Sequence, residues 1–270
     1  MKVNNYCQSD ELKYCILCYP VNYKITDKNN EYYNKINQDL LYSQYNKFIN
    51  ALSKNNVKLY FLDINKNAAD QVFTQDIGFA VDNILFVSKM RKKERDIETE
   101  NFVNFVKENN IRYYEMKNNM EGGDVIKYKD VVFVGISSRT TIQAANELQE
   151  VLINLGSNSK VIPINFDKSK IHLDCAFNTL DKESAVISPY VYDKKIIEKY
   201  IKNLYEISKK DADDLGTNYV YLGNKKLLST NKSVTEMLKE NGYEVEFIDY
   251  SEIMKSHGSI GCSSMFILRE

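Results

Sequence analysis

The sequence lacks the features that mark several large classes of protein. It contains no tryptophan, only three prolines and two histidines. No apolar run approaches the roughly 18 residues that a membrane-spanning helix needs, and the first ten residues lack the apolar segment of an export signal. We therefore expect a cytoplasmic protein that does not bind membranes. The few prolines and the absence of a low-complexity linker predict one continuous domain over residues 1–270.

Neither sign of charge dominates the chain. It carries 36 basic and 37 acidic side chains, for a formal net charge of -1. A nucleic-acid-binding surface needs an excess of positive charge, so nucleic acid is not an expected partner. The hydrophobic content of 43% is enough for a sizeable core.

The chain has five cysteines, an odd number, and in a cytoplasmic protein we expect them to be reduced thiols. Cys15 and Cys18 form a C-x-x-C string, but it lies in an apolar segment typical of a buried strand. No second pair completes a zinc site. The spacing therefore favours a core position for both thiols over metal binding, and Cys7 has no predicted role.

The pattern of apolar segments repeats along the chain. A helix is predicted over residues 31–54 and a strand over 57–62. Four units follow, each with two short strands, a helix and a further strand, and their predicted helices cover 94–109, 141–155, 194–203 and 233–241. The N-terminal segment and a last strand starting at Cys262 complete a fifth unit. Repeats of roughly 40 to 55 residues indicate a closed ring of similar units; an irregular α/β sheet is the alternative.

Cys262 lies where a glycine-containing loop meets a predicted apolar strand. The loop reads Gly258-Ser-Ile-Gly261, and the two glycines leave room for a substrate beside the sulfur. A thiol in this position can act as a nucleophile in its thiolate form. The alternative is a small apolar side chain that packs at the start of a strand.

His172 and Asp174 are separated by one residue, so they point to the same face if they begin a strand, as predicted. A carboxylate beside a histidine raises the pKa of the imidazole, which suits general acid catalysis. The alternative is a histidine that only makes a structural hydrogen bond.

Other charged residues lie at predicted strand ends. Glu121-Gly-Gly-Asp124 is either a solvated turn or a tight turn that directs Glu121 into a pocket. Asp70 and Asp76 flank a short apolar strand predicted near residues 72–74, and they need a cationic partner if they are buried. Arg139 follows an apolar strand, where it can cap the strand or hold a carboxylate.

In this order the motifs resemble those of the guanidino-group-modifying enzyme superfamily, which includes arginine deiminases, dimethylarginine dimethylaminohydrolases and amidinotransferases. The motifs are Asp70-x5-Asp76, Arg95-x-x-Glu98, Glu121-Gly-Gly-Asp124, Gly135-Ile-Ser-Ser-Arg-Thr140, His172-Leu-Asp174 and Gly258-x-x-Gly-Cys262. The resemblance implies an α/β pentein fold, a five-fold pseudo-symmetric propeller of ββαβ units, in agreement with the repeat.

The resemblance also implies roles for these residues. Cys262 would attack the central carbon of a guanidinium group and form a thiouronium. His172 would protonate the departing amine and then activate water, while Glu121 would orient His172. Asp76 and Asp174 would bind guanidinium nitrogens.

Further residues complete the site that the resemblance implies. Arg139 would hold the substrate carboxylate, with Arg95 as a second candidate, and Asp70 and Gln75 belong to the same substrate-binding group. The reaction needs no metal or cofactor. The expected partner is a small guanidine, and a homodimer is the default expectation.

The motifs leave three functions open. The spacing of Asp70 and Asp76 resembles dimethylarginine dimethylaminohydrolases, whereas His172-x-Asp174 resembles arginine deiminases and amidinotransferases, and Gln75 departs from both. The leading hypothesis is a hydrolase that converts arginine or N-methylated arginine to citrulline plus ammonia or a methylamine. The alternatives are a transferase that passes the amidino group to an amine, and a non-catalytic binding protein of the same fold.

Overall fold

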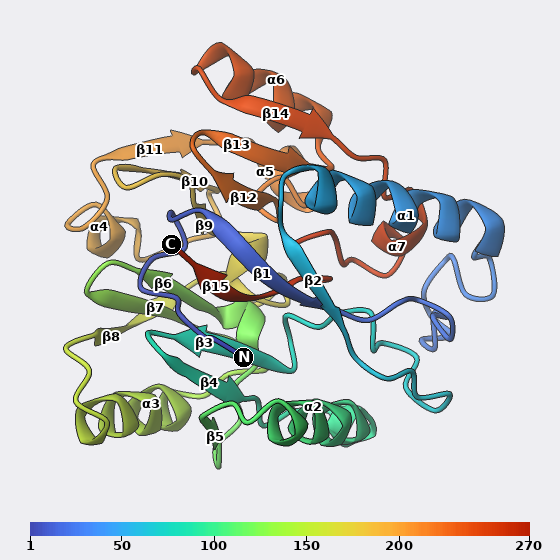
Figure 1. The fold of residues 1–270 in the computed structure, drawn as a ribbon. Helices are drawn as coiled ribbons and strands as arrows, with labels where there is room; N and C mark the ends of the chain where they lie inside the picture. The colour runs from blue at the N-terminus through green and yellow to red at the C-terminus, as the bar shows by residue number, and fades with distance from the viewer.

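The computed structural model describes residues 1–270 as five small sheets of three strands each. The long helices lie on the outside of the molecule, as Figure 1 shows for α1 (Gln38–Lys54), α2 (Asp96–Glu108), α3 (Ile142–Asn154) and α6 (Lys232–Glu240). In every sheet the central strand pairs antiparallel with one neighbour and parallel with the other. The five repeated units predicted from the sequence are therefore confirmed.

One sheet combines strands from both ends of the chain, and each of the other four is built from three consecutive strands. With the central strand in the middle, they are β15 (Met265–Arg269), β1 (Leu12–Leu17) and β2 (Lys58–Phe61); β3 (Gly78–Val81), β4 (Ile84–Val87) and β5 (Tyr113–Glu115); β6 (Val125–Tyr128), β7 (Val131–Ile136) and β8 (Lys160–Asn165); β9 (Phe177–Thr179), β10 (Ser184–Ile187) and β11 (Asn203–Glu206); and β12 (Val220–Gly223), β13 (Lys226–Ser229) and β14 (Glu244–Phe247). The remaining helices are short: η1 (Lys93–Arg95), η2 (Gly122–Asp124), η3 (Leu173–Cys175), α4 (Lys194–Ile197), α5 (Lys209–Asp213) and α7 (Ser251–Met254).

Each unit buries the apolar face of its helix against its own sheet. In α1 the buried positions Leu41, Tyr45, Phe48 and Leu52 recur every three or four residues, which is the spacing of one helical face. These side chains share a core cluster with Leu12, Cys15 and Leu17 of β1. Burying a side chain of this size stabilises the fold by about 1.5–3 kcal/mol. The apolar periodicity therefore explains both why this segment is helical and why the helix packs against β1.

Two predicted helices differ in extent from those observed. Helix α1 begins at Gln38 rather than at residue 31, because the Asn37 side chain caps it by accepting the backbone N–H of Leu40 at 3.1 Å. The helix predicted over 194–203 ends at Ile197 after about one turn, since β11 already begins at Asn203.

Three predicted strand starts are wrong. The segment near residues 72–74 is a turn, in which Phe73 N–H bonds Asp70 O at 2.9 Å. The strand predicted from Cys175 begins at Phe177, because the residues after His172 form the 3-10 turn η3. Cys262 does not begin a strand either: it lies in a turn, and β15 starts at Met265. In all three places turns replace the predicted strand, and so they direct side chains toward a common centre.

The turns before the first strand of four sheets form one end of the ring. Asp76 precedes β3, Glu121 precedes β6, His172 precedes β9 and Cys262 precedes β15. Residues from different units therefore meet at this end. The hairpin turns that join the first and second strands form the opposite end.

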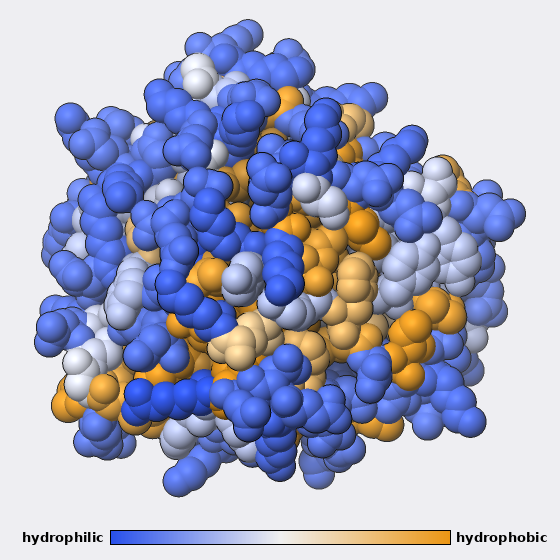
Figure 2. All heavy atoms as spheres, viewed as in Figure 1, coloured by the Kyte–Doolittle hydropathy of each residue, from blue (hydrophilic) through white to orange (hydrophobic).

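One face of the molecule is mainly polar. Figure 2, in the view of Figure 1, shows hydrophilic residues over most of the face, with apolar residues between them near its middle. None of the helices combines the length and apolar composition that crossing a bilayer requires.

Candidate active site

The predicted site residues surround one cavity of about 200 Å³ at the end of the ring where the turns converge. Its walls include most of the residues singled out in the sequence, namely Asp70, Asp76, Arg95, Arg139, His172 and Cys262. The exposed residues Asp27, Lys92 and His257 also line it, so the cavity reaches the surface. The cysteine and the histidine are both buried, which places them in its interior.

Both ring nitrogens of His172 face carboxylates. Nε2 lies 2.9 Å from Oε2 of Glu121, and Nδ1 lies 3.5 Å from Oδ1 of Asp76. Burial alone would lower the pKa of His172, but Asp76 and Glu121 outweigh it and hold that pKa well above its ordinary value. The ring is therefore an imidazolium at neutral pH, which is the form that can donate a proton.

Glu121 is held ionised by its neighbours. It accepts Arg139 Nη1 at 3.2 Å and the backbone N–H of Arg91 at 3.1 Å, in addition to its bond with His172. Burial would raise the pKa of Glu121, but His172 and then Arg139 lower it to about 2. The carboxylate therefore keeps its charge beside the imidazolium throughout the neutral range.

The two glycines after Glu121 are explained by close packing. A Cβ on Gly122 would lie 2.1 Å from the backbone oxygen of Gln75, and one on Gly123 would lie 2.7 Å from Nδ1 of His172. Only glycine lets the η2 turn approach this closely. The Glu-Gly-Gly-Asp string is therefore a tight turn that directs Glu121 into the site, as one of the two interpretations of the sequence held.

Asp124 ties the loops of two units together. Its Oδ1 accepts the backbone N–H of Leu173 at 2.9 Å, and its Oδ2 accepts the hydroxyl of Ser137 at 2.7 Å. Burial raises the pKa of Asp124 to about 6. These bonds fix the backbone directly after His172, which orients the imidazole.

Arg95 pairs with carboxylates of the protein itself. Its Nη1 lies 2.6 Å from Oδ2 of Asp76, and its Nη2 lies 2.8 Å from Oε2 of Glu98, which also accepts Nε. Three of the five N–H groups of the guanidinium are thus engaged. Because the side chain still lines the cavity, the other two remain for a ligand.

Cys262 is positioned by main-chain bonds on both sides. Its N–H donates to Oδ1 of Asn218 at 3.0 Å, and its carbonyl accepts the N–H of Gln75 at 3.0 Å. A Cβ on Gly261 would lie 2.7 Å from Asn218, and one on Gly258 would lie 2.3 Å from the Phe73 ring. Both glycines are thus required by neighbouring side chains, and not only by room for a substrate as the sequence suggested.

A second thiol lies beside Cys262. Sγ of Cys175 donates to Oδ1 of Asp174 at 3.4 Å. The two sulfur atoms and a carboxylate oxygen of Asp174 all lie within 4.8 Å of one another. Burial raises the pKa of Asp174 to about 7. This trio could in principle hold a metal ion, and so could the side chains of Asp76, Glu121 and His172. In the second group, however, the imidazolium, Arg95 and Arg139 already supply the positive charge that the carboxylates need.

Three predicted residues, Gln75, Glu121 and Asp174, do not line the cavity directly, and two residues that the sequence did not reveal belong to the site. Gln75 does not line the cavity; its Nε2 donates to Gly122 O at 3.3 Å, so it supports the η2 turn. Asn218 and Cys175 were not predicted to belong to the site. Nothing in the sequence around Asn218 points to it, whereas Cys175 directly follows the His-x-Asp motif.

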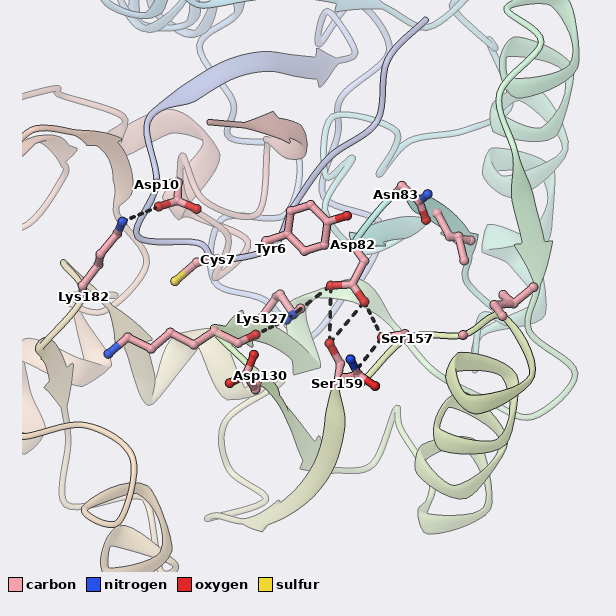
Figure 3. Close-up of a pocket in the computed structure, with 15 residues that line it drawn as sticks. Tyr6, Cys7, Asp10, Asp82, Asn83, Lys127, Asp130, Ser157, Ser159 and Lys182 are labelled. Atoms are coloured by element: carbon pink, nitrogen blue, oxygen red, sulfur yellow. Dashed lines mark hydrogen bonds and ion pairs between the residues drawn. The ribbon is translucent and has the colours of Figure 1, made fainter.

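A larger cavity, of about 550 Å³, lies at the opposite end of the ring, beside the hairpin turns and the N-terminal segment. Figure 3 shows that four of its charged side chains form two pairs: Lys127 lies 3.4 Å from Asp82, and Lys182 lies 3.4 Å from Asp10. Ser159 also donates to Asp82. Because no predicted site residue lines it, this cavity is not the candidate active site.

The sequence is similar to those of known guanidino-modifying enzymes. A family model described as "N,N dimethylarginine dimethylhydrolase, eukaryotic" matches residues 21–269. The uncharacterized protein YkgA of Bacillus subtilis is 33% identical over 268 residues, covering 96% of this chain and 92% of its own. The dimethylarginine dimethylaminohydrolase of Streptomyces coelicolor is 22% identical over 235 residues, covering 86% and 87%.

Solved structures show the same fold. The product-bound N-terminal domain of ArgZ, an arginine dihydrolase from cyanobacteria, superposes with a TM-score of 0.86 at 21% identity, covering 96% of this chain and 98% of that domain. A dimethylarginine dimethylaminohydrolase bound to 4-chloro-2-hydroxymethylpyridine has a TM-score of 0.78 at 20% identity, covering 95% and 100%. The pentein fold predicted from the motifs is confirmed.

Proposed function

This chain belongs to the N,N dimethylarginine dimethylhydrolase family, within the guanidino-group-modifying superfamily, and on that premise we propose that it is a cysteine-dependent guanidine hydrolase. The substrate is arginine or an N-methylated arginine, and the products are citrulline and ammonia or a methylamine. The observation that carries the proposal is the imidazolium of His172, held between Glu121 and Asp76 in the same cavity as the Cys262 thiol.

Guanidinium binding rests on the carboxylates of the cavity. Oδ1 of Asp76 is buried and accepts no hydrogen bond, although a buried carboxylate oxygen without a donor is costly. An N–H of a substrate guanidinium would supply that donor. Asp174, beside Cys262, offers a second carboxylate, and the planar guanidinium fork suits two such acceptors. A bound cation would also hold Asp174 ionised despite its burial.

The first half of the reaction uses Cys262 and His172. The Cys262 thiolate attacks the guanidinium carbon, and the cationic substrate beside the sulfur favours the thiolate form. The tetrahedral adduct collapses as His172 gives its proton to the departing amine. A thiouronium on Cys262 and a neutral imidazole remain. Support for such a covalent step comes from ArgZ, whose N-terminal domain has been captured covalently bound to a reaction intermediate.

The second half returns the enzyme to its starting state. Neutral His172 takes a proton from water, which attacks the thiouronium carbon. Collapse of this adduct breaks the carbon–sulfur bond and releases the Cys262 thiolate, and the hydroxyl group of the adduct loses its proton to solvent as the ureido product forms. Glu121 stabilises the imidazolium again as it forms, so the same residue serves as acid and then as base.

The α-carboxylate of the substrate is assigned to positively charged side chains of the cavity. Arg139 lines the cavity and uses Nη1 for Glu121, which leaves other N–H groups for an α-carboxylate. The free N–H groups of Arg95 and the exposed Lys92 border the same space. This arrangement favours an amino acid over agmatine, which has no carboxylate.

The proposal is tested by an assay for ureido product and for ammonia, with arginine, its methylated forms and agmatine as substrates. Each is supplied with and without glycine or lysine as amine acceptor. We expect citrulline from one arginine-like substrate without an acceptor, and none from a Cys262→Ser variant that remains folded. Cys7→Ser, at the far end of the ring, is the matched control.

Other outcomes would replace the proposal. Turnover retained in Cys262→Ser would refute it. Amidino products that appear only with an amine present would identify a transferase instead. Ammonia in excess of citrulline would indicate a second hydrolytic step, a possibility raised by the arginine dihydrolase among the similar structures.

A further inference from the structure

Cys175 and Cys262 come from different units but end in the same cavity. Their sulfur atoms and an Asp174 carboxylate oxygen lie within 4.8 Å of one another, and both thiols are free. Neither backbone belongs to a sheet, because Cys175 ends the η3 turn and Cys262 lies in the turn before β15. The thiol pair therefore lies in segments that can adjust without breaking strand pairing.

We propose that Cys175 and Cys262 form a peroxide-sensitive dithiol, in which Cys262 is oxidised first and Cys175 closes a disulfide with it. The pair is then a modification site distinct from the hydrolytic reaction. Its consequence for turnover, a reversible loss of activity, rests on the proposed role of Cys262 as nucleophile. The formation of the disulfide itself does not depend on that role.

The surroundings assign different parts to the two thiols. Cys175 donates its proton toward Asp174, and the neighbouring Cys262 together with burial holds the pKa of Cys175 well above its ordinary value. Since a thiolate and not a thiol attacks peroxide, Cys175 is not the first to react. Both thiols line a cavity that reaches the surface and contains the cationic groups of Arg95 and His172, so the bond to Asp174 is what distinguishes Cys175 from Cys262.

The chemistry balances with hydrogen peroxide as the oxidant. The Cys262 thiolate attacks one peroxide oxygen, the O–O bond breaks, and the products are a sulfenic acid on Cys262 and water after protonation. Sγ of Cys175 then attacks Sγ of the sulfenic acid, its proton passes to the departing hydroxide by way of Asp174, and a second water leaves. The two thiols lose two electrons in total, and the peroxide gains them.

The geometry favours the disulfide over further oxidation. A sulfenic acid without a nearby thiol proceeds to sulfinic acid, which is not reversed by ordinary thiols. Here the sulfur of the resolving thiol already lies within 4.8 Å of the reacting sulfur. The other three cysteines do not line this cavity, and Cys7 lines the cavity at the opposite end of the ring. A dithiol reductant would reopen the bond by exchange.

The experiment treats the reduced full-length protein with a small molar excess of hydrogen peroxide, alkylates the remaining thiols and maps the peptides by mass spectrometry. We expect a cross-linked peptide that joins Cys175 and Cys262 and a loss of about two of the five thiols per chain. Dithiothreitol should restore both thiols. In Cys175→Ser, Cys262 should instead reach sulfinic acid and should not be recovered by dithiothreitol. Cys7→Ser is the matched control and should behave as the wild-type chain does.

Each result decides the matter. Wild-type protein in which Cys262 is alkylated or sulfinic, with no peptide linking it to Cys175, would overturn the proposal. So would full recovery of Cys262 by dithiothreitol in Cys175→Ser or, if that variant does not fold, in Cys175→Ala. Because the mapping needs no substrate, a disulfide in a chain that hydrolyses no guanidine would support this inference while refuting the proposed function.

Discussion

Both ring nitrogens of His172 face carboxylates: Nε2 is hydrogen-bonded to Glu121 at 2.9 Å, and Nδ1 forms an ion pair with Asp76 at 3.5 Å. The two carboxylates belong to two other units of the ring, so three units together set the protonation state of one side chain.

Glu121→Gln should move the pH dependence of turnover. The variant keeps a hydrogen-bonding side chain but removes the charge that raises the pKa of His172, so that pKa falls and the alkaline limb of the kcat profile shifts to lower pH. We expect kcat to drop by about 100-fold. Glu252→Gln, at a buried acid that pairs with Lys255, is the control. A profile of unchanged shape in Glu121→Gln would contradict the assignment.

Asp174→Asn should stabilise the empty protein while it impairs function. The pKa of Asp174 is raised by burial from 3.8 to about 7, so the charged form opposes folding. The loss of unfolding free energy is absent below the pKa of 3.8 that Asp174 has in the unfolded chain. It grows as the pH rises from 4 to 7 and reaches its full size above the folded-state pKa of about 7. We expect the variant to gain about 2–4 kcal/mol of unfolding free energy at pH 8 and little at pH 4.

Denaturant unfolding at the two pH values measures this difference, and turnover is measured on the same samples. Asp130→Asn, at an exposed position, should show no such pH-dependent gain. Equal stability of Asp174→Asn and the wild-type chain at pH 8 would show that the carboxylate is not an unfavourable buried charge.

Gly123→Ala should disrupt the site through its packing against His172. A Cβ at this position would lie 2.7 Å from Nδ1 of His172, and overpacking of this kind costs about 1–3 kcal/mol. Because the ring must move, we also expect a loss of turnover of at least about tenfold. Gly156→Ala is a useful comparison, since it has a φ of 78° but no atom near the new Cβ. It should lose some stability and keep its kcat, as measured by melting and steady-state kinetics.

Arg139→Ala should weaken recognition of a substrate carboxylate. The ratio of kcat/KM for the arginine-like substrate to that for agmatine should fall by about tenfold or more, because only the former presents a carboxylate. Arg139 also pairs with Glu121, so its loss disturbs Glu121 with either substrate. The ratio of the two kcat/KM values cancels this shared effect. Arg112→Ala, an exposed arginine, controls for the loss of a positive charge. If the ratio stayed constant, another group would have to bind the carboxylate.

Several features of the site could be predicted from local sequence because they depend on short-range rules. The apolar periodicity of α1 reflects one buried helical face, and the Glu-Gly-Gly-Asp string marks a turn that other residues could not make. The order of the six motifs was sufficient to predict the pentein fold. Cys262, His172 and Glu121 were selected by residue type and position, and the structure brings all three to one end of the ring.

Other features depend on contacts between units that are distant in the sequence. The turn after His172 was predicted as a strand, because the bond from Leu173 N–H to Asp124 is invisible in the local pattern. Likewise Arg95 could not be assigned to Asp76 and Glu98, nor Asn218 to the backbone of Cys262, before the loops were placed.

The sequence by itself determined the repeated units, their helices and the chemical types available for a guanidine site, since these follow from periodicity and residue chemistry. Only the tertiary structure decided which charges meet, which thiol lies near Cys262 and which carboxylates raise the pKa of His172. The physical reason is that burial and pairing set these properties, and both arise only where the turns of different units converge.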